Sequence, residues 1–115
     1  MNGWVGVDLD GTLAKYDGWQ GPDHVGEPIE PMVALVKDWL LSGKDVRIFT
    51  ARVSTDGSAK RNGEVRLATW AIRGWCTKHL GQELPITCSK DFGMQVLYDD
   101  RCVQVESNTG RLISN

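Results

Sequence analysis

Two aspartates, Asp8 and Asp10, stand two positions apart where a short apolar run ends. Residues two apart on an extended strand project to the same face, so both carboxylates can address one substrate. Gly11 then permits a sharp turn before Thr12. With ordinary composition, Asp-x-Asp-Gly-Thr arises by chance at roughly one start position in 10^5, so it is a strong signal of chemistry. The alternative is a strand-terminal turn that caps a helix, where Asp and Gly are common.

Further polar residues follow three other apolar stretches that resemble strands. Thr50 closes the second stretch, Lys90 follows the third, and the pair Asp99 and Asp100 ends the fourth. In parallel sheets the ligand crevice lies beyond the carboxyl ends of the strands. We therefore expect these side chains to converge with the two N-terminal aspartates. Taken singly, each has a simpler interpretation, as a partner for backbone groups, a solvated loop charge or a polar turn.

A cluster of three or four carboxylates favours a bound cation, because the charges otherwise repel one another and raise their pKa values. Mg²⁺ is a hard ion that takes oxygen ligands, typically one or two carboxylates together with substrate phosphate and water. Lys90 and the Thr50 hydroxyl would supply a positive charge and a hydrogen bond to phosphoryl oxygens. The residues thus predict magnesium-dependent phosphoryl chemistry.

The elements that must position these residues alternate between strands and helices. One helix is signalled by Pro31 in its first turn and stops at Gly43, and a longer one follows the polar loop 54–63 and stops at Gly81. The expected strands cover residues 4–9, 45–50, 85–88 and 94–98, and a terminal antiparallel hairpin pairs 103–105 with 111–113 around Asn108-Thr109-Gly110.

This alternation implies right-handed crossovers and an α/β fold. We expect a single Rossmann-like three-layer domain over residues 1–115, with a mainly parallel sheet, helices on both faces and the C-terminal hairpin as its antiparallel part. A chain of 115 residues with 41% hydrophobic content is large enough for one core and too short for two ordinary domains.

Composition excludes several classes of protein. A formal charge of −2 gives no overall attraction to nucleic acid or to anionic membranes. Three cysteines without CxxC spacing argue against a disulfide framework or structural zinc. The amino terminus lacks the charged and long apolar regions of a signal peptide, and no segment is long enough to span a bilayer. We therefore expect a cytoplasmic protein.

Four short motifs resemble, in chain order, those of the haloacid dehalogenase-like (HAD) hydrolases. The matching residues are Asp8 to Leu13, Thr50, Lys90, and the pair Asp99-Asp100. The stretch 50–52 and the tail 90–110 are similar to small HAD proteins of phages and bacteria, so the resemblance covers nearly the whole chain.

The resemblance implies a mechanism and a set of ligands. Asp8 would attack phosphorus to give an aspartyl-phosphate, while Asp10 would protonate the leaving group and then activate water. Mg²⁺ would bind Asp8, the backbone carbonyl of Asp10 and Asp99, and Asp100 would reach it directly or through water.

The residues expected to bind the substrate flank the first two motifs. Segment 52–78 is basic, which is usually the mark of a solvated helix face. Its first half follows the second strand, however, so we expect its first three basic residues on the rim of the crevice, binding a second anionic group. Trp19, in the loop after the first motif, is a candidate to line the pocket. The full set of expected substrate-binding residues is Gly11, Thr12, Ala51, Arg52, Lys60 and Arg61.

Many HAD enzymes close the site with an inserted cap domain. The two intervals where one would be inserted, 14–30 and 88–94, are too short here for more than a loop or small flap, so we expect minimal or no cap. A thinly covered site excludes water poorly. Either the substrate then acts as its own lid, or a second subunit of a homo-oligomer covers the opening.

The best-supported function is a phosphatase acting on a small phosphorylated metabolite, a nucleotide, or a phosphate at the end of a nucleic acid or on a protein. The alternative is a receiver-like signalling module or a non-catalytic module that binds phosphate and metal. A receiver places its acceptor aspartate after a middle strand and its lysine after the acidic residues, whereas here Asp-x-Asp-Gly-Thr comes first and the acidic pair last. A dead scaffold would lack Asp8 or Asp10, and both are present.

Overall fold

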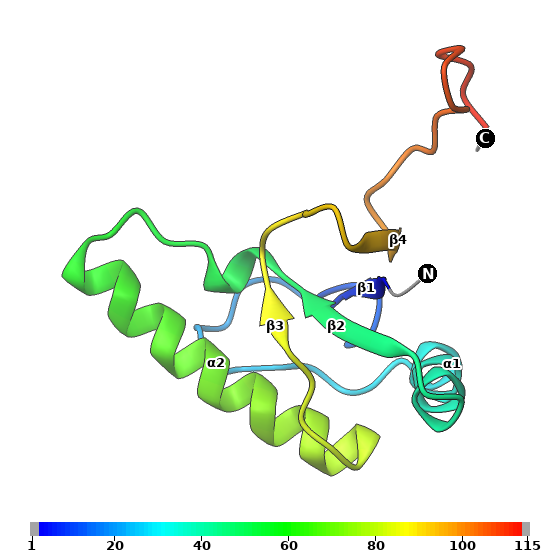
Figure 1. The fold of residues 1–115 in the computed structure, drawn as a ribbon. Coiled ribbons are helices and arrows are strands. Elements are labelled where there is room, and N and C mark those ends of the chain that lie inside the picture. The colour runs from blue at the N-terminus through cyan, green and yellow to red at the C-terminus, as the bar shows by residue number, and fades with distance from the viewer. Residues whose placement is uncertain (1–2, 114–115) are drawn as a thin grey trace.

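The computed structural model describes residues 3–113. Strands and helices alternate as the sequence predicts, with one short 3-10 helix, η1, that the sequence pattern does not predict. In chain order the elements are β1 (Trp4–Asp8), α1 (Glu30–Leu41), β2 (Asp45–Phe49), η1 (Ala51–Val53), α2 (Ala59–Leu80), β3 (Ile86–Thr87) and β4 (Met94–Tyr98) (Figure 1).

The four strands form one parallel sheet in the order β3-β2-β1-β4. β1 pairs on both sides, and Val7 lies opposite Ile48 of β2 and opposite Tyr98 of β4. The first four residues of β1 are buried, which is why this strand is an almost continuous apolar run. The α/β fold with a mainly parallel sheet is confirmed.

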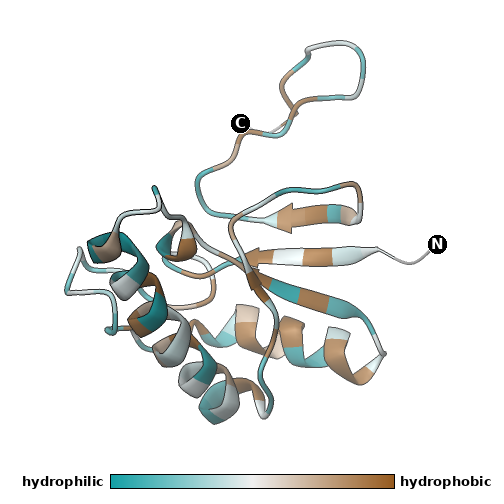
Figure 2. Cartoon of the chain, turned by 60° about the vertical axis from the view of Figure 1, so that its left-hand side comes forward, coloured by the Kyte–Doolittle hydropathy of each residue, from teal (hydrophilic) through white to brown (hydrophobic). Residues whose placement is uncertain are grey.

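Both helices pack on the same face of the sheet (Figure 2). One core joins Val46 and Ile48 of the sheet with Val36 of α1 and Ile72 of α2. The structure differs here from the predicted three-layer arrangement, because among residues 3–113 the helices form only one layer against the sheet. The reason is chain length: the connection between β3 and β4, residues 88–93, is too short to hold a further helix.

The helix α2 begins earlier than its glycine content suggests. The sequence pattern predicts a loop through Gly63, but the Ser58 side chain accepts a hydrogen bond from the backbone N–H of Arg61 at 3.1 Å and caps the helix before it. Gly81 ends α2 as predicted, in a left-handed conformation with φ of 84°. Within residues 3–113 no helix has both the length and the apolar character that a membrane crossing requires.

The interval between β1 and α1 forms a loop instead of a cap domain. Residues 15–27, which we call the flap loop, contain no helix or strand. Its two ends are joined, because the backbone N–H of Lys15 donates to the carbonyl oxygen of Glu27 at 2.8 Å. Trp75 of α2 donates its indole N–H to the carbonyl oxygen of Gly26 at 2.8 Å, which fixes the loop to the core.

The C-terminal segment after β4 leaves the body of the domain (Figure 1). It turns where predicted, with positive φ angles of 66° at Asn108 and 79° at Gly110. Val105 and Leu112 form one isolated antiparallel bridge, but no strand forms on either side of it. The predicted hairpin therefore stays unconfirmed, and its two halves do not join the sheet.

Candidate active site

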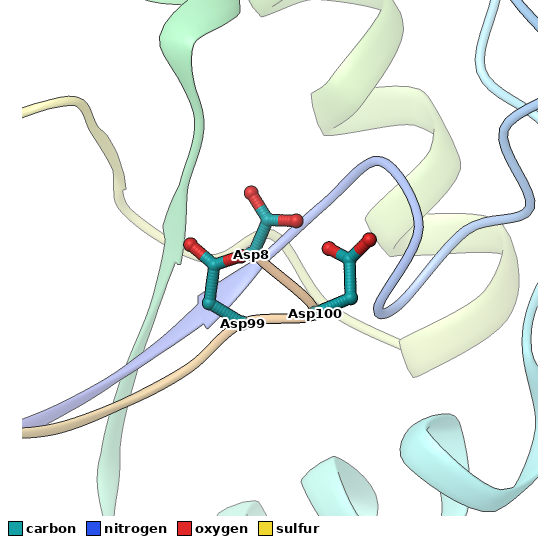
Figure 3. Close-up of side chains that lie close together, drawn as sticks. All are labelled: Asp8, Asp99 and Asp100. Carbon is teal, nitrogen blue, oxygen red and sulfur yellow. The ribbon is translucent and has the colours of Figure 1, made fainter. Parts of the chain in front are cut away.

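Three aspartates meet at the carboxyl ends of β1 and β4. Asp8 ends β1, and Asp99 and Asp100 follow β4, which pairs with β1. Each aspartate offers one carboxylate oxygen, and these three oxygens all lie within 4.8 Å of one another. Figure 3 shows the three carboxylates close together. The structure thus brings together the first and last acidic residues of the predicted site, a cluster that we call the aspartate triad.

A single hydroxyl group links two members of the triad, Asp8 and Asp100. Thr12 is buried, and its Oγ1 lies 3.0 Å from Oδ1 of Asp100 and 3.4 Å from Oδ2 of Asp8. The hydroxyl has one proton, so it donates to one carboxylate at a time. It also accepts the backbone N–H of Asp100 at 2.9 Å. Thr12, expected to bind substrate, therefore serves to hold the two ends of the chain together.

The turn after β1 requires a glycine at position 11. Gly11 has φ of 92°, a conformation that residues with a side chain rarely adopt. A Cβ at this position would also lie 2.5 Å from Oδ2 of Asp100. Gly11, also expected to bind substrate, therefore shapes the triad through the close approach of its backbone to Asp100.

Replacing Gly11 by Ala should lower the free energy of unfolding by more than the same change at Gly57. Both glycines have positive φ, 92° and 87°, so both variants bear backbone strain, which costs about 1–2 kcal/mol per residue. Only Gly11→Ala adds a steric clash, since nothing lies within 4 Å of a Cβ at Gly57. Urea unfolding measures the difference, and an equal loss in both variants would contradict the packing described.

The environment of the triad changes the acidity of Asp8. Partial burial, followed by the charges of Asp99 and Asp100, raises the pKa of Asp8 to about 7. Carboxylate oxygens are the ligands that hard divalent ions prefer, and a cation would remove the repulsion that causes part of this shift. The donor set therefore fits Mg²⁺, and Asp8, Asp99 and Asp100 are the residues that would hold it.

Without a metal ion, the contribution of Asp8 to the free energy of unfolding should fall as pH rises from about 4 to about 7. The pKa of Asp8 is raised from an ordinary 3.8 to about 7, so the folded chain binds more protons than the unfolded chain in this range. The stabilising contribution is complete below the lower value and is lost as the pH passes the upper one. Urea unfolding in the presence of a chelator, repeated across this pH range, measures the free energy of unfolding. The variant Asp8→Asn serves as the reference. A difference between the two proteins that does not change with pH would contradict this account.

Asp10 lies outside the triad and pairs with Arg52. The guanidinium donates from Nε to Oδ2 at 2.8 Å and from Nη2 to Oδ1 at 2.9 Å. Such a bidentate pair fixes both the position and the orientation of the carboxylate. The carboxylate of Asp10 is therefore directed to Arg52, and the acidic cluster among the described residues does not include it. The metal ligand that the resemblance implies for Asp10 is its backbone carbonyl, which this contact leaves untouched.

Arg52 also holds the flap loop. Its Nη1 donates to the carbonyl oxygens of His24 at 2.6 Å and Pro22 at 3.2 Å, and its guanidinium carbon lies 5.1 Å from the centre of the Trp19 ring. Arg52 is only 7% exposed. The sequence predicts it as a rim residue that binds the substrate, whereas the structure places it beneath the flap loop with four of its five N–H groups in use.

Thr50 lies where predicted, at the carboxyl end of β2. Its Oγ1 accepts the backbone N–H of Arg52 at 3.2 Å and so caps η1, and its own backbone N–H donates to Thr87 of β3 at 2.9 Å. Thr50 is almost fully buried and also lines the cleft described next.

A cleft of about 660 Å³ opens over the carboxyl ends of β1 and β2, with the aspartate triad in its wall. A cleft of about 740 Å³ lies at the amino ends of the strands, beside Trp4 and Phe92, but the triad does not line it. Ligand crevices of parallel sheets lie at the carboxyl ends, so the first cleft is the candidate. Besides the triad, it is lined by Asp10, Gly11, Tyr16, Trp19, Phe49, Thr50, Ala51, Arg52, Arg61 and Arg101.

Three predicted site residues do not line this cleft: Thr12, which is buried, and two exposed lysines. Lys90 is exposed in the connection between β3 and β4, and Lys60 is exposed in the first turn of α2. Arg61 does line the cleft, but its guanidinium donates to the carbonyl oxygens of Ser54, Ala51 and Arg52 at 2.6, 3.1 and 2.9 Å. These bonds join α2 to η1, so Arg61 has a structural task at the site.

Three cleft residues escape the sequence analysis: Tyr16, Phe49 and Arg101. Arg101 directly follows the acidic pair, and this adjacency is the signal that points to it. Tyr16 shares the flap loop with Trp19, which the sequence does single out. Phe49 reads as an ordinary apolar strand residue and gives no signal.

Comparison with known proteins supports the fold. No protein-family model matches the chain, and no curated protein matches it. A solved structure of a conserved protein from Bacteroides thetaiotaomicron is similar over 90% of this chain and 79% of its own length, with a TM-score of 0.60 and 20% sequence identity. At that identity the similarity shows a shared α/β fold and nothing about activity.

Proposed function

We propose that the chain is a magnesium-dependent phosphomonoester hydrolase whose nucleophile is the carboxylate of Asp8. The observation that carries the proposal is the aspartate triad, with oxygens within 4.8 Å of one another at the carboxyl edge of a parallel sheet. The order of the motifs, which resembles that of the HAD hydrolases, supports phosphoryl transfer among the reactions such a site could serve. We also propose a cytoplasmic location. The three cysteines of the chain are free thiols, in keeping with that location.

Asp8, Asp99 and Asp100 would hold Mg²⁺, which when bound would neutralise charge on the phosphoryl oxygens. Oδ1 of Asp99 accepts the backbone N–H of Arg101 at 2.8 Å, and Oδ1 of Asp100 accepts the Thr12 hydroxyl at 3.0 Å. These bonds orient both carboxylates and leave the second oxygen of each for the ion.

The reaction proceeds in two displacements at phosphorus, with Asp8 as the nucleophile of the first and the leaving group of the second. A carboxylate oxygen of Asp8 attacks phosphorus, the ester P–O bond breaks, and the leaving oxygen takes a proton from Asp10. In the second step Asp10 takes a proton from water, and the water oxygen attacks the phosphorus of the aspartyl-phosphate. Inorganic phosphate leaves, and Asp8 is regenerated as a carboxylate.

The contact with Arg52 is compatible with the role of Asp10 as acid and base. Each oxygen of the Asp10 carboxylate accepts one N–H from Arg52, so the second lone pair of each oxygen stays available for a proton. Because Arg52 is itself buried and bound to the flap loop, Asp10 is held in one position for both steps.

The purified chain with Mg²⁺ should release inorganic phosphate from p-nitrophenyl phosphate, and Asp8→Asn should remove this activity. Asp10→Asn should lower kcat roughly 10²- to 10⁴-fold, the usual contribution of general acid–base catalysis. Chelation should stop turnover, and added Mg²⁺ should restore it.

The matched control is Asp38→Asn, an exposed aspartate of α1, which should keep full activity. Turnover that survives in Asp8→Asn would show that the nucleophile is assigned wrongly. Phosphorylation of Asp8 by a small phosphodonor without turnover would instead favour the receiver-like alternative.

A further inference from the structure

Two aromatic side chains of the flap loop face the cleft and have no part in the proposed chemistry. Tyr16 is 48% exposed and Trp19 is 55% exposed, and both line the cleft that holds the aspartate triad. The cleft, at about 660 Å³, has the size of a small-molecule site and is far larger than a phosphoryl group requires. The part of the substrate beyond the phosphate therefore has room beside these rings.

The ring of Trp19 is held in place by the residue beneath it. The guanidinium carbon of Arg52 lies 5.1 Å from the ring centre, a cation–π contact. Arg52 is fixed in turn by its bidentate bonds to Asp10 and by its bond to the carbonyl oxygen of His24. A ring already fixed before binding loses little conformational freedom when a ligand packs on it.

The flap loop that carries Trp19 is also fixed at its base. Lys15 bonds to Glu27 across the two ends of the loop, and the indole N–H of Trp75 bonds to the carbonyl oxygen of Gly26. The flap loop is thus bonded to two different elements of the domain, to α2 through Trp75 and to η1 through Arg52. An exposed, pre-positioned indole in the same cleft as the catalytic groups suits a planar partner better than a flexible aliphatic one.

We infer that Trp19 stacks on a planar aromatic group of the substrate, so the preferred substrates are phosphate esters that carry such a group, as nucleotides do. This inference rests on the proposed function, because it names the substrate class of the same site. Stacking between a base and an aromatic side chain strengthens binding roughly 5- to 150-fold. A sugar phosphate without a base lacks this contact.

The kinetic test compares adenosine 5′-monophosphate, O-phosphotyrosine and ribose 5-phosphate. The ratio of kcat/KM for the better aromatic ester to that for ribose 5-phosphate should be on the order of tenfold or more. Trp19→Leu should bring the ratio close to one, while Trp19→Phe should retain most of it. Trp70→Ala, an exposed tryptophan of α2 outside this cleft, is the control and should leave the ratio unchanged. The two aromatic esters distinguish a nucleobase from a phenolic ring as the stacked group.

A binding experiment separates this inference from the proposed function. Calorimetry with the Asp8→Asn variant, which should not turn over, compares the same three compounds with and without the additional change Trp19→Leu. If the chain hydrolyses none of the esters but an aromatic ester binds more tightly than ribose 5-phosphate in a Trp19-dependent way, the proposed function fails and the inference stands. If the aromatic esters bind no better than ribose 5-phosphate, or if Trp19→Leu leaves their advantage intact, the inference is wrong.

Discussion

The mutual repulsion of three carboxylates is the constraint on which the site depends. Asp8, Asp99 and Asp100 come from opposite ends of the chain, and their oxygens lie within 4.8 Å. Burial and the two neighbouring charges raise the pKa of Asp8 to about 7, so the arrangement is unfavourable by itself. Pairing of β1 with β4 and the Thr12 hydroxyl hold it together. A hard cation is the partner that would offset the repulsion, and its field would act where a phosphoryl group gathers charge.

The ion pair between Arg52 and Asp10 organises the other half of the cleft. One guanidinium contacts the proposed acid and base, the carbonyl groups of the flap loop and the ring of Trp19. Breaking a buried pair of this kind by removing one partner leaves an uncompensated charge, which is strongly unfavourable. A loop between β1 and α1 can therefore form a defined cleft in place of a cap domain, because a buried arginine holds this loop beside the strand ends.

The sequence predicts the strands, the parallel sheet and the convergence of the acidic residues, because these follow from local apolar patterns and the geometry of strand ends. It does not predict the layers, since which face a helix covers depends on the path of the whole chain. An arginine that follows a strand is expected to bind substrate. Arg52 is buried because the flap loop packs against it, and the local sequence does not predict that contact. The place of Lys90 likewise depends on how the short connection 88–93 runs between the two edges of the sheet.

The most direct test of the central claim is a calorimetric titration of the chain with Mg²⁺ at a pH well above 7, the value to which the pKa of Asp8 is raised. The account predicts uptake of a single ion per chain. That uptake should be greatly weakened in Asp8→Asn and in Asp99→Asn, and unchanged in a variant of an exposed aspartate away from the cleft, such as Asp38→Asn. No uptake by the unmodified chain, or uptake that neither triad substitution alters, would contradict it.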